Sequence, residues 1–137
     1  MDQTEKRLFL IRSLLDEQPK YQGMDIPADA SEQKRLLRSL FNVRMPGKIS
    51  DDFISVQDEY LREEIESAGI TDVLELTPVE DGIYLWQGDI TTLRCDAIVN
   101  AANSGMTGCY APCHACIDNP ILFQITHDFS SFARASA

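Results

Sequence analysis

Apolar residues recur at spacings of three and four through residues 1–70, which is the period of an amphipathic helix. The pattern predicts three helices, over residues 5–17, 31–42 and 51–68. Each helix has one apolar stripe and an opposite face rich in charge, so the stripes are expected to pack on one another. This part of the chain carries no recognisable chemistry and is predicted to be a helical extension.

The residues at the ends of these segments support the same boundaries. Asp29 or Ser31 begins the second helix, and Asp29 has capping-box spacing to Glu32. Ser50 and the two aspartates after it are suited to cap the third helix. Gly69 is a favourable residue just past a helix end. The sequence therefore predicts where these helices start and stop as well as that they form.

The pattern changes after Gly69, where two short apolar runs replace the helical period. Ile83–Trp86 and Ala97–Val99 are uninterrupted in hydrophobicity and bounded by turn residues, which predicts central, buried strands. Gln87–Asp96 is long enough for a tight crossover between them. The fold class expected is α/β, with the strands delivering ligand-binding residues to their carboxyl ends.

Composition and charge narrow the function classes. The chain has 137 residues, enough for one modest domain, and a net charge of −10 that excludes a nucleic-acid-coating protein. Residues 71–137 hold only two basic residues against eight acids, so an anion there must be bound by backbone amides, helix N-termini or a metal. No apolar run approaches the roughly 18 residues of a membrane span, and no signal peptide is apparent. We expect a cytoplasmic protein, with no membrane partner.

Four potential metal ligands fall within eight positions: Cys109, Cys113, His114 and Cys116. Their spacing does not match the paired knuckles of structural zinc sites. Three of them, Cys109, His114 and Cys116, would form a soft zinc site with an open fourth position, as in zinc sites that bind water or substrate. The alternative is that the thiols are small buried residues of a loop. An iron–sulfur cluster is disfavoured because its fourth thiolate would have to be the distant Cys95.

Polar residues with two interpretations flank these ligands. Asp89 follows a glycine and is either a cap or turn residue or a ligand-binding carboxylate. Asn103 lies in the amide-rich turn Asn100–Gly105 and either bonds its own backbone or orients a sugar hydroxyl. Asp118 is a candidate general base or substrate-orienting carboxylate. Taken singly, none of these residues specifies a function.

Three segments together resemble the macrodomain family, whose members bind ADP-ribose. They are GDIT at residues 88–91, DAIVNAANS at residues 96–104, and GCYAPCHACIDN at residues 108–119. The last resembles the zinc-containing bacterial subclass, protein-ADP-ribose hydrolases that remove ADP-ribose from modified proteins. The helices of residues 1–70 are also similar to the N-terminal extension of that subclass.

The resemblance implies a role for each matched residue. Asp89 would contact adenine, with Ile90 beside it in the same pocket, and Asn103 would contact the distal ribose. Asp118 would lie near the scissile ribose and position or activate water, so Asn103 and Asp118 are the catalytic candidates. The ligand implied is ADP-ribose or a mono-ADP-ribosylated protein.

The resemblance also assigns the metal. Cys109, His114 and Cys116 match the zinc ligands, whereas Cys113 stands where the family has no required ligand. Zinc and the Asn103 amide would together hold and polarise the distal ribose. The implied cofactor is therefore zinc.

The implied fold is an incomplete three-layer α/β/α macrodomain sheet, with the domain part at residues 71–119 and a divergent tail at residues 120–137. The similarity stops after Asn119, so we expect a truncated or frameshifted product. A sheet of so few strands is marginal and leaves edges uncovered, which predicts self-association and no hydrolysis by the chain alone. The alternatives are a module that binds ADP-ribose without catalysis and an inactive gene fragment.

Overall fold

The computed structural model describes residues 1–45, 47–105, 108–112, 116–117 and 119. Its first half contains three helices, α1 (Gln3–Asp16), α2 (Ala30–Val43) and α3 (Asp51–Ala68). They agree with the three predicted helices to within two residues at each end. The helical prediction for the first half of the chain is confirmed.

Local side-chain caps fix the beginnings of these helices. Asp2 and Glu5 form a reciprocal capping box at α1. The Asp29 carboxylate accepts hydrogen bonds from the backbone N–H groups of Ser31 and Glu32 at the start of α2. Ser50 caps α3, which ends at Gly69 with φ of 87°, a conformation that favours glycine. The caps expected at the second and third helices are therefore confirmed.

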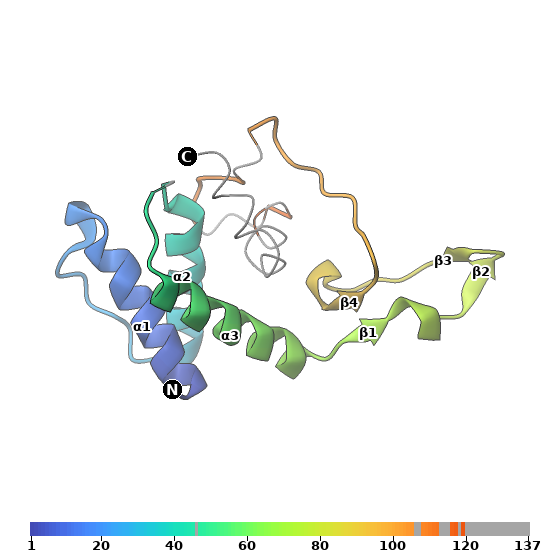
Figure 1. The fold of residues 1–137 in the computed structure, drawn as a ribbon, viewed down its shortest axis with the longest axis horizontal. Coiled ribbons are helices and arrows are strands. Elements are labelled where there is room, and N and C mark those ends of the chain that lie inside the picture. The colour runs from blue at the N-terminus through green and yellow to red at the C-terminus, as the bar shows by residue number, and fades with distance from the viewer. Residues whose placement is uncertain (46, 106–107, 113–115, 118, 120–137) are drawn as a thin grey trace.

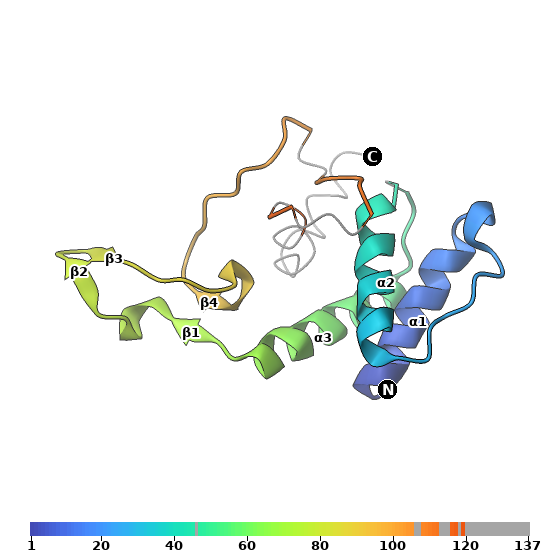
Figure 2. The ribbon, with the colours of Figure 1, turned by 180° about the vertical axis from the view of Figure 1, so that it is seen from behind.

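The hydrophobic core lies between these helices. Helix α1 contacts both α2 and α3, and the three lie together at one end of the molecule in both ribbon views (Figures 1 and 2). Leu10 and Ile11 of α1 are completely buried. The other buried apolar residues among those described are Leu14, Leu15, Leu37, Leu40, Phe41, Phe53, Val56, Tyr60 and Leu61. Every member of this core belongs to one of the three helices.

Polar contacts made by two buried side chains of α1, Lys6 and Arg7, join the same helices. Lys6 is only 4% exposed, and its ammonium group lies 2.6 Å from Glu63 and 3.1 Å from Glu59 on α3. The hydrogen bond to Glu63 raises the pKa of Lys6 above its usual value, despite the opposing effect of burial. Arg7 donates to the side chain of Gln33 on α2, so α1 is tied to both partners.

The strands are short and form two separate pairs. β1 (Thr71–Asp72) lies parallel to β4 (Leu93–Arg94), and β2 (Pro78–Glu80) is antiparallel to β3 (Ile83–Tyr84). Single 3-10 turns η2 (Val73–Glu75) and η3 (Ile90–Thr92) stand between them, and η1 (Pro19–Tyr21) follows α1. We call residues 71–94 the arm, because they extend away from α1 and α2 in both ribbon views (Figures 1 and 2). The expected α/β class, with helices first, is confirmed.

The predicted strands differ from the observed ones in length and burial. Ile83–Trp86 is a strand only over its first two residues, and Ile83 is 54% exposed. Ala97–Val99 is not a strand, and Val99 is 95% exposed. No described strand pairs with residues 97–99, so their backbone groups have no ladder to join. Both runs were predicted as buried and central, and that prediction is wrong for the described structure.

Two further predictions concern the whole chain. Within the described ranges, no helix combines the length and the apolar character that crossing a membrane requires. The division into residues 1–70, 71–119 and 120–137 stays a prediction, and residues 120–137 lie outside the described residues.

Candidate functional site

Asp89 caps the short turn η3. Its Oδ1 atom accepts hydrogen bonds from the backbone N–H of Thr91 at 3.0 Å and from the Thr91 hydroxyl at 2.7 Å. Asp89 is exposed, Ile90 is half-buried, and η3 contacts α3. Among the described residues, nothing hydrogen-bonds the second carboxylate oxygen of Asp89. One oxygen therefore fixes the turn, and the other remains available to a ligand.

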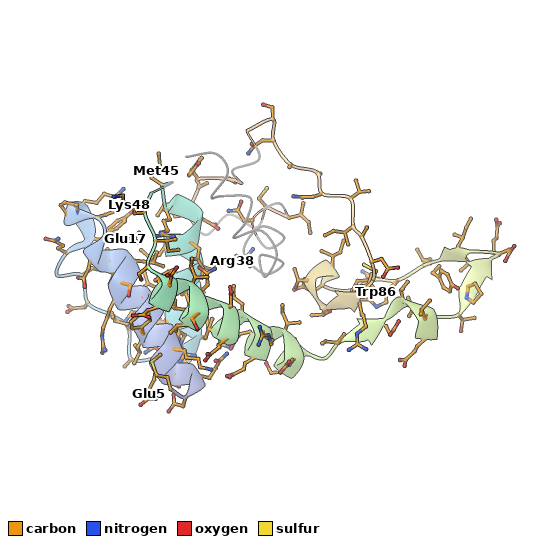
Figure 3. All side chains as sticks on the ribbon, in the orientation of Figure 1. Glu5, Glu17, Arg38, Met45, Lys48 and Trp86 are labelled. Atoms are coloured by element: carbon orange, nitrogen blue, oxygen red, sulfur yellow. The ribbon has the colours of Figure 1, made fainter. Side chains whose placement is uncertain are left out.

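Position 88 has room only for glycine, because the Trp86 ring lies against its backbone. A Cβ atom at position 88 would lie 2.3 Å from Cζ2 of Trp86, a distance that real contacts do not reach. The Trp86 ring is half-buried and belongs to the arm, well away from α1 and α2 (Figure 3). Glycine at this position allows the tryptophan to pack against the backbone immediately before Asp89.

Both the oxygen and the nitrogen of the Asn103 side-chain amide hydrogen-bond to backbone groups of its own loop. Its Oδ1 atom accepts from the backbone N–H of Gly105 at 3.0 Å, and its Nδ2 atom donates to the carbonyl of Gly108 at 2.7 Å. Gly108 has φ of 73°, in the region that favours glycine. The first interpretation of Asn103, a residue that bonds its own backbone, describes this arrangement. A sugar hydroxyl would have to share or replace these bonds.

Asn119 connects the two described cysteines of the metal-ligand cluster. Its side chain accepts from the backbone N–H of Cys109 at 2.5 Å and donates to the Cys109 carbonyl at 2.8 Å. Its own backbone N–H donates to the carbonyl of Cys116 at 3.2 Å. Asn119 is 1% exposed, whereas both cysteines are half-buried. One buried residue therefore holds both ends of the segment from Cys109 to Cys116.

Sequence reasoning did not single out Asn119. Its only signal was its place at the end of the CIDN segment, directly after the candidate Asp118. The bonds to Cys109 span ten positions, and no local pattern of residues predicts such a pair. The structure was needed to find it.

The same loop is attached to the helical half of the molecule. Asn42, near the end of α2, donates from Nδ2 to the carbonyl of Ala111 at 3.3 Å and is only 3% exposed. In Figure 1 the chain leaves β4, runs away from the arm and returns toward α2. This hydrogen bond thus joins α2 to the loop two residues after Cys109.

The donors present suit a soft metal ion. Cys109 and Cys116 supply sulfur, which zinc prefers together with imidazole. His114, Cys113 and Asp118 lie outside the described residues, so the predicted set is represented here by its two cysteines. In the part of the chain that is described, no three His, Cys, Asp or Glu residues are grouped so as to hold a metal ion. The assignment of zinc to Cys109, His114 and Cys116 stays a prediction.

The predicted site residues fall into two groups. Asn103 hydrogen-bonds to Gly108, and Asn119 hydrogen-bonds to Cys109, the next residue along the chain after Gly108, and to Cys116. Asp89 lies apart on η3, beside α3, and makes none of these contacts. Among the described residues, the structure therefore places Asn103 beside the Cys109 end of the loop and leaves the adenine-side candidates, Asp89 and Ile90, on a separate element.

Comparison with known proteins gives this cluster a context. The chain is 58% identical over 125 residues to a protein-ADP-ribose hydrolase of Treponema medium, a match that covers 88% of this chain and 48% of that protein. The chain is similar to protein-ADP-ribose hydrolases. It is also 41% identical over 114 residues to the enzyme of that name from Staphylococcus aureus strain Mu50, covering 82% of this chain and 42% of that protein. No family model matches the chain.

A more distant relative carries a related name. A probable bifunctional ADP-ribose hydrolase/ADP-ribosyltransferase of Fusarium oxysporum f. sp. cubense is 39% identical over 97 residues, covering 63% of this chain and 16% of that protein. The chain spans about half the length of the curated bacterial relatives it matches. All three of these relatives carry ADP-ribose hydrolase in their names.

The Treponema match includes the whole candidate site. It leaves 12% of this chain, about 16 residues, outside. Eighteen residues follow Asn119, so the match extends past that residue wherever it begins. It also includes α2 and α3, which shows that the similarity extends to the helical half.

Proposed function

We propose that this chain recognises the ADP-ribose group of mono-ADP-ribosylated proteins, with a zinc site in the loop of residues 109–116. The observation that carries the proposal is the 58% identity to a protein-ADP-ribose hydrolase across a match that includes every candidate residue. The hydrogen bonds that hold Asn103 to Gly108 and Asn119 to Cys109 support it, because polar groups with a fixed orientation are what a sugar–phosphate ligand requires.

Each described residue has a role that its surroundings permit. The second carboxylate oxygen of Asp89 accepts a hydrogen bond from the adenine amino group, while the first keeps η3 in place. Ile90 gives that end of the ligand an apolar contact. The backbone amides after Asn103 bind the diphosphate, which suits a region with only two basic residues against eight acids.

The reaction end of the ligand lies with the loop. Asn103 orients the distal ribose through its side-chain amide, and Cys109, His114 and Cys116 hold the metal. Zinc, when bound, supplies an electrophile that polarises the ribose and its leaving group. Asp118 positions or activates the water that attacks the bond between ADP-ribose and the protein side chain.

A second candidate is a module that binds ADP-ribose without hydrolysing the bond. The observation that favours it is the small extent of the described strands, which are two or three residues long and form two-stranded pairs. Leu74 and Leu85 of the arm are each 82% exposed. Two-stranded sheets are marginal in water, and a mobile pocket wall weakens catalysis more than binding. These uncovered edges also favour association between copies of the chain.

One experiment separates the two candidates. The purified chain, reduced, supplied with zinc and immobilised on a resin, is incubated with a mono-ADP-ribosylated protein and, separately, with the same protein unmodified. Retention of the modified protein alone supports recognition, and release of free ADP-ribose adds hydrolysis. We expect recognition with little or no release. Equal retention of both proteins would refute the proposed function.

A further inference from the structure

We propose that Asn119 is a positioning residue that holds Cys109 and Cys116 in their arrangement before any metal binds. This inference rests on the proposed function for its metal. Its evidence is independent of that metal, because it consists of hydrogen bonds among residues of this chain.

The contacts of Asn119 are directed at the backbone of both cysteines. The side-chain amide pairs with Cys109 through two hydrogen bonds of opposite direction, of 2.5 and 2.8 Å, which restricts rotation of that residue as well as its position. The backbone N–H of Asn119 reaches the carbonyl of Cys116. A single residue thereby limits how far the two cysteines can separate.

Burial makes this arrangement selective for asparagine. Asn119 is 1% exposed, so a polar group at this position must find its partners within the protein. A primary amide supplies one acceptor and two donors, and the backbone of Cys109 presents one donor and one acceptor. Alanine would remove these two partners from the backbone groups of the half-buried Cys109.

The consequence for metal binding follows from preorganisation. A loop whose cysteines are already held close loses less conformational freedom when a metal binds. Residues that orient metal ligands without touching the metal typically change affinity by about 10- to 100-fold when they are replaced. We expect a change of that size for Asn119→Ala.

The test measures metal affinity and thiol reactivity in the full chain. Zinc affinity is obtained by competition with a chromophoric chelator, and cobalt(II) reports thiolate coordination through its charge-transfer absorption. The variants are Asn119→Ala, Cys116→Ser and the control Gln33→Ala, which removes a buried amide that bonds Arg7 and Pro27 in the helical half. Circular dichroism monitors the helices of each variant.

We expect Asn119→Ala to weaken zinc binding by about 10-fold or more and to lower the cobalt charge-transfer absorption, while Gln33→Ala binds as the wild type does. Wild-type zinc affinity in Asn119→Ala, in a protein whose wild type binds zinc, would overturn the inference. Loss of zinc binding in Cys116→Ser separately tests the proposed metal site.

A measurement made without metal tests the role of Asn119 separately from the proposed zinc site. In a Cys95→Ser, Cys113→Ser background, the thiols that remain are Cys109 and Cys116. Their rate of reaction with an aromatic disulfide reagent should rise in Asn119→Ala and stay unchanged in Gln33→Ala. If the wild type binds no zinc, the proposed metal site fails, and this rate alone decides the role of Asn119. An unchanged rate would then overturn it.

Discussion

Replacing Asp89 by asparagine separates its structural contact from its proposed contact with adenine. The Oδ1 atom of Asp89 already accepts two hydrogen bonds from Thr91, at 3.0 and 2.7 Å. Asparagine retains an oxygen at that position and caps a turn about as well as aspartate does. The change therefore preserves η3 and converts only the second oxygen from an acceptor into a donor.

The expected loss follows from the bond that disappears. A hydrogen bond to a charged group contributes about 1.5–3 kcal/mol, and each 1.4 kcal/mol changes a dissociation constant about tenfold. Asp89→Asn should therefore weaken ADP-ribose binding by about 10- to 100-fold in isothermal titration calorimetry. The helical circular dichroism should not change, because the substitution leaves the core of α1–α3 intact.

Asp72 provides a matched control in the same arm. It caps η2 through a hydrogen bond from the backbone N–H of Leu74 at 2.9 Å, which repeats the geometry at Asp89. Its ion pair with Arg94 is 3.7 Å long and the arginine side chain is 67% exposed, so the loss of this pair should have little effect. Asp72→Asn should bind ADP-ribose as the wild type does. Equal affinity in Asp89→Asn and the wild type would refute the assignment of Asp89 to adenine.

Three further predictions concern the fold that supports the site. Leu10→Ala should destabilise the helices by about 2–5 kcal/mol, measured by urea denaturation with circular dichroism, because Leu10 is fully buried; a change below that range would mean the helical core repacks around the gap. In wild type, the fluorescence of Trp86, the one tryptophan of the chain and a residue of the arm, should change at lower urea than the helical signal. Coincident transitions would show that arm and helices unfold as one unit. Burial, reinforced by the charge of Glu64, raises the pKa of Tyr60 from 10.0 to about 12. The protonated phenol therefore contributes fully to the stability of the folded state below pH 10, and this contribution is lost as the pH rises toward 12. Spectrophotometric titration should find one of the four tyrosines ionising late, and Tyr60→Phe should remove that step.

The helices were predictable because their signals are local. The periodic stripes, the caps at Asp29 and Ser50 and the glycine at position 69 all act within a few residues of one another. The extent and pairing of the strands were not predictable in this way, because a strand forms only where a partner supplies its hydrogen bonds. The apolar run Ala97–Val99 has no described partner and is not a strand, whereas β1 and β4 pair across twenty residues that no local pattern connects.

The candidate site shows the same contrast. The sequence identified Asp89, Asn103 and the cysteine loop by type and spacing, and it named the local turn bonds that the structure contains at Asp89 and Asn103. It did not identify Asn119, because the pairing with Cys109 depends on how the loop closes. Residue type indicates what chemistry is available, but the closure of the loop determines which groups meet.

Amide hydrogen exchange with and without ADP-ribose tests the central claim most directly, because it locates the bound ligand along the chain. The account predicts slower exchange at residues 88–92 and 103–109 when ADP-ribose is present, with α1 and α2 unchanged. Protection confined to the helices, or binding that leaves both of these segments unchanged, would contradict it.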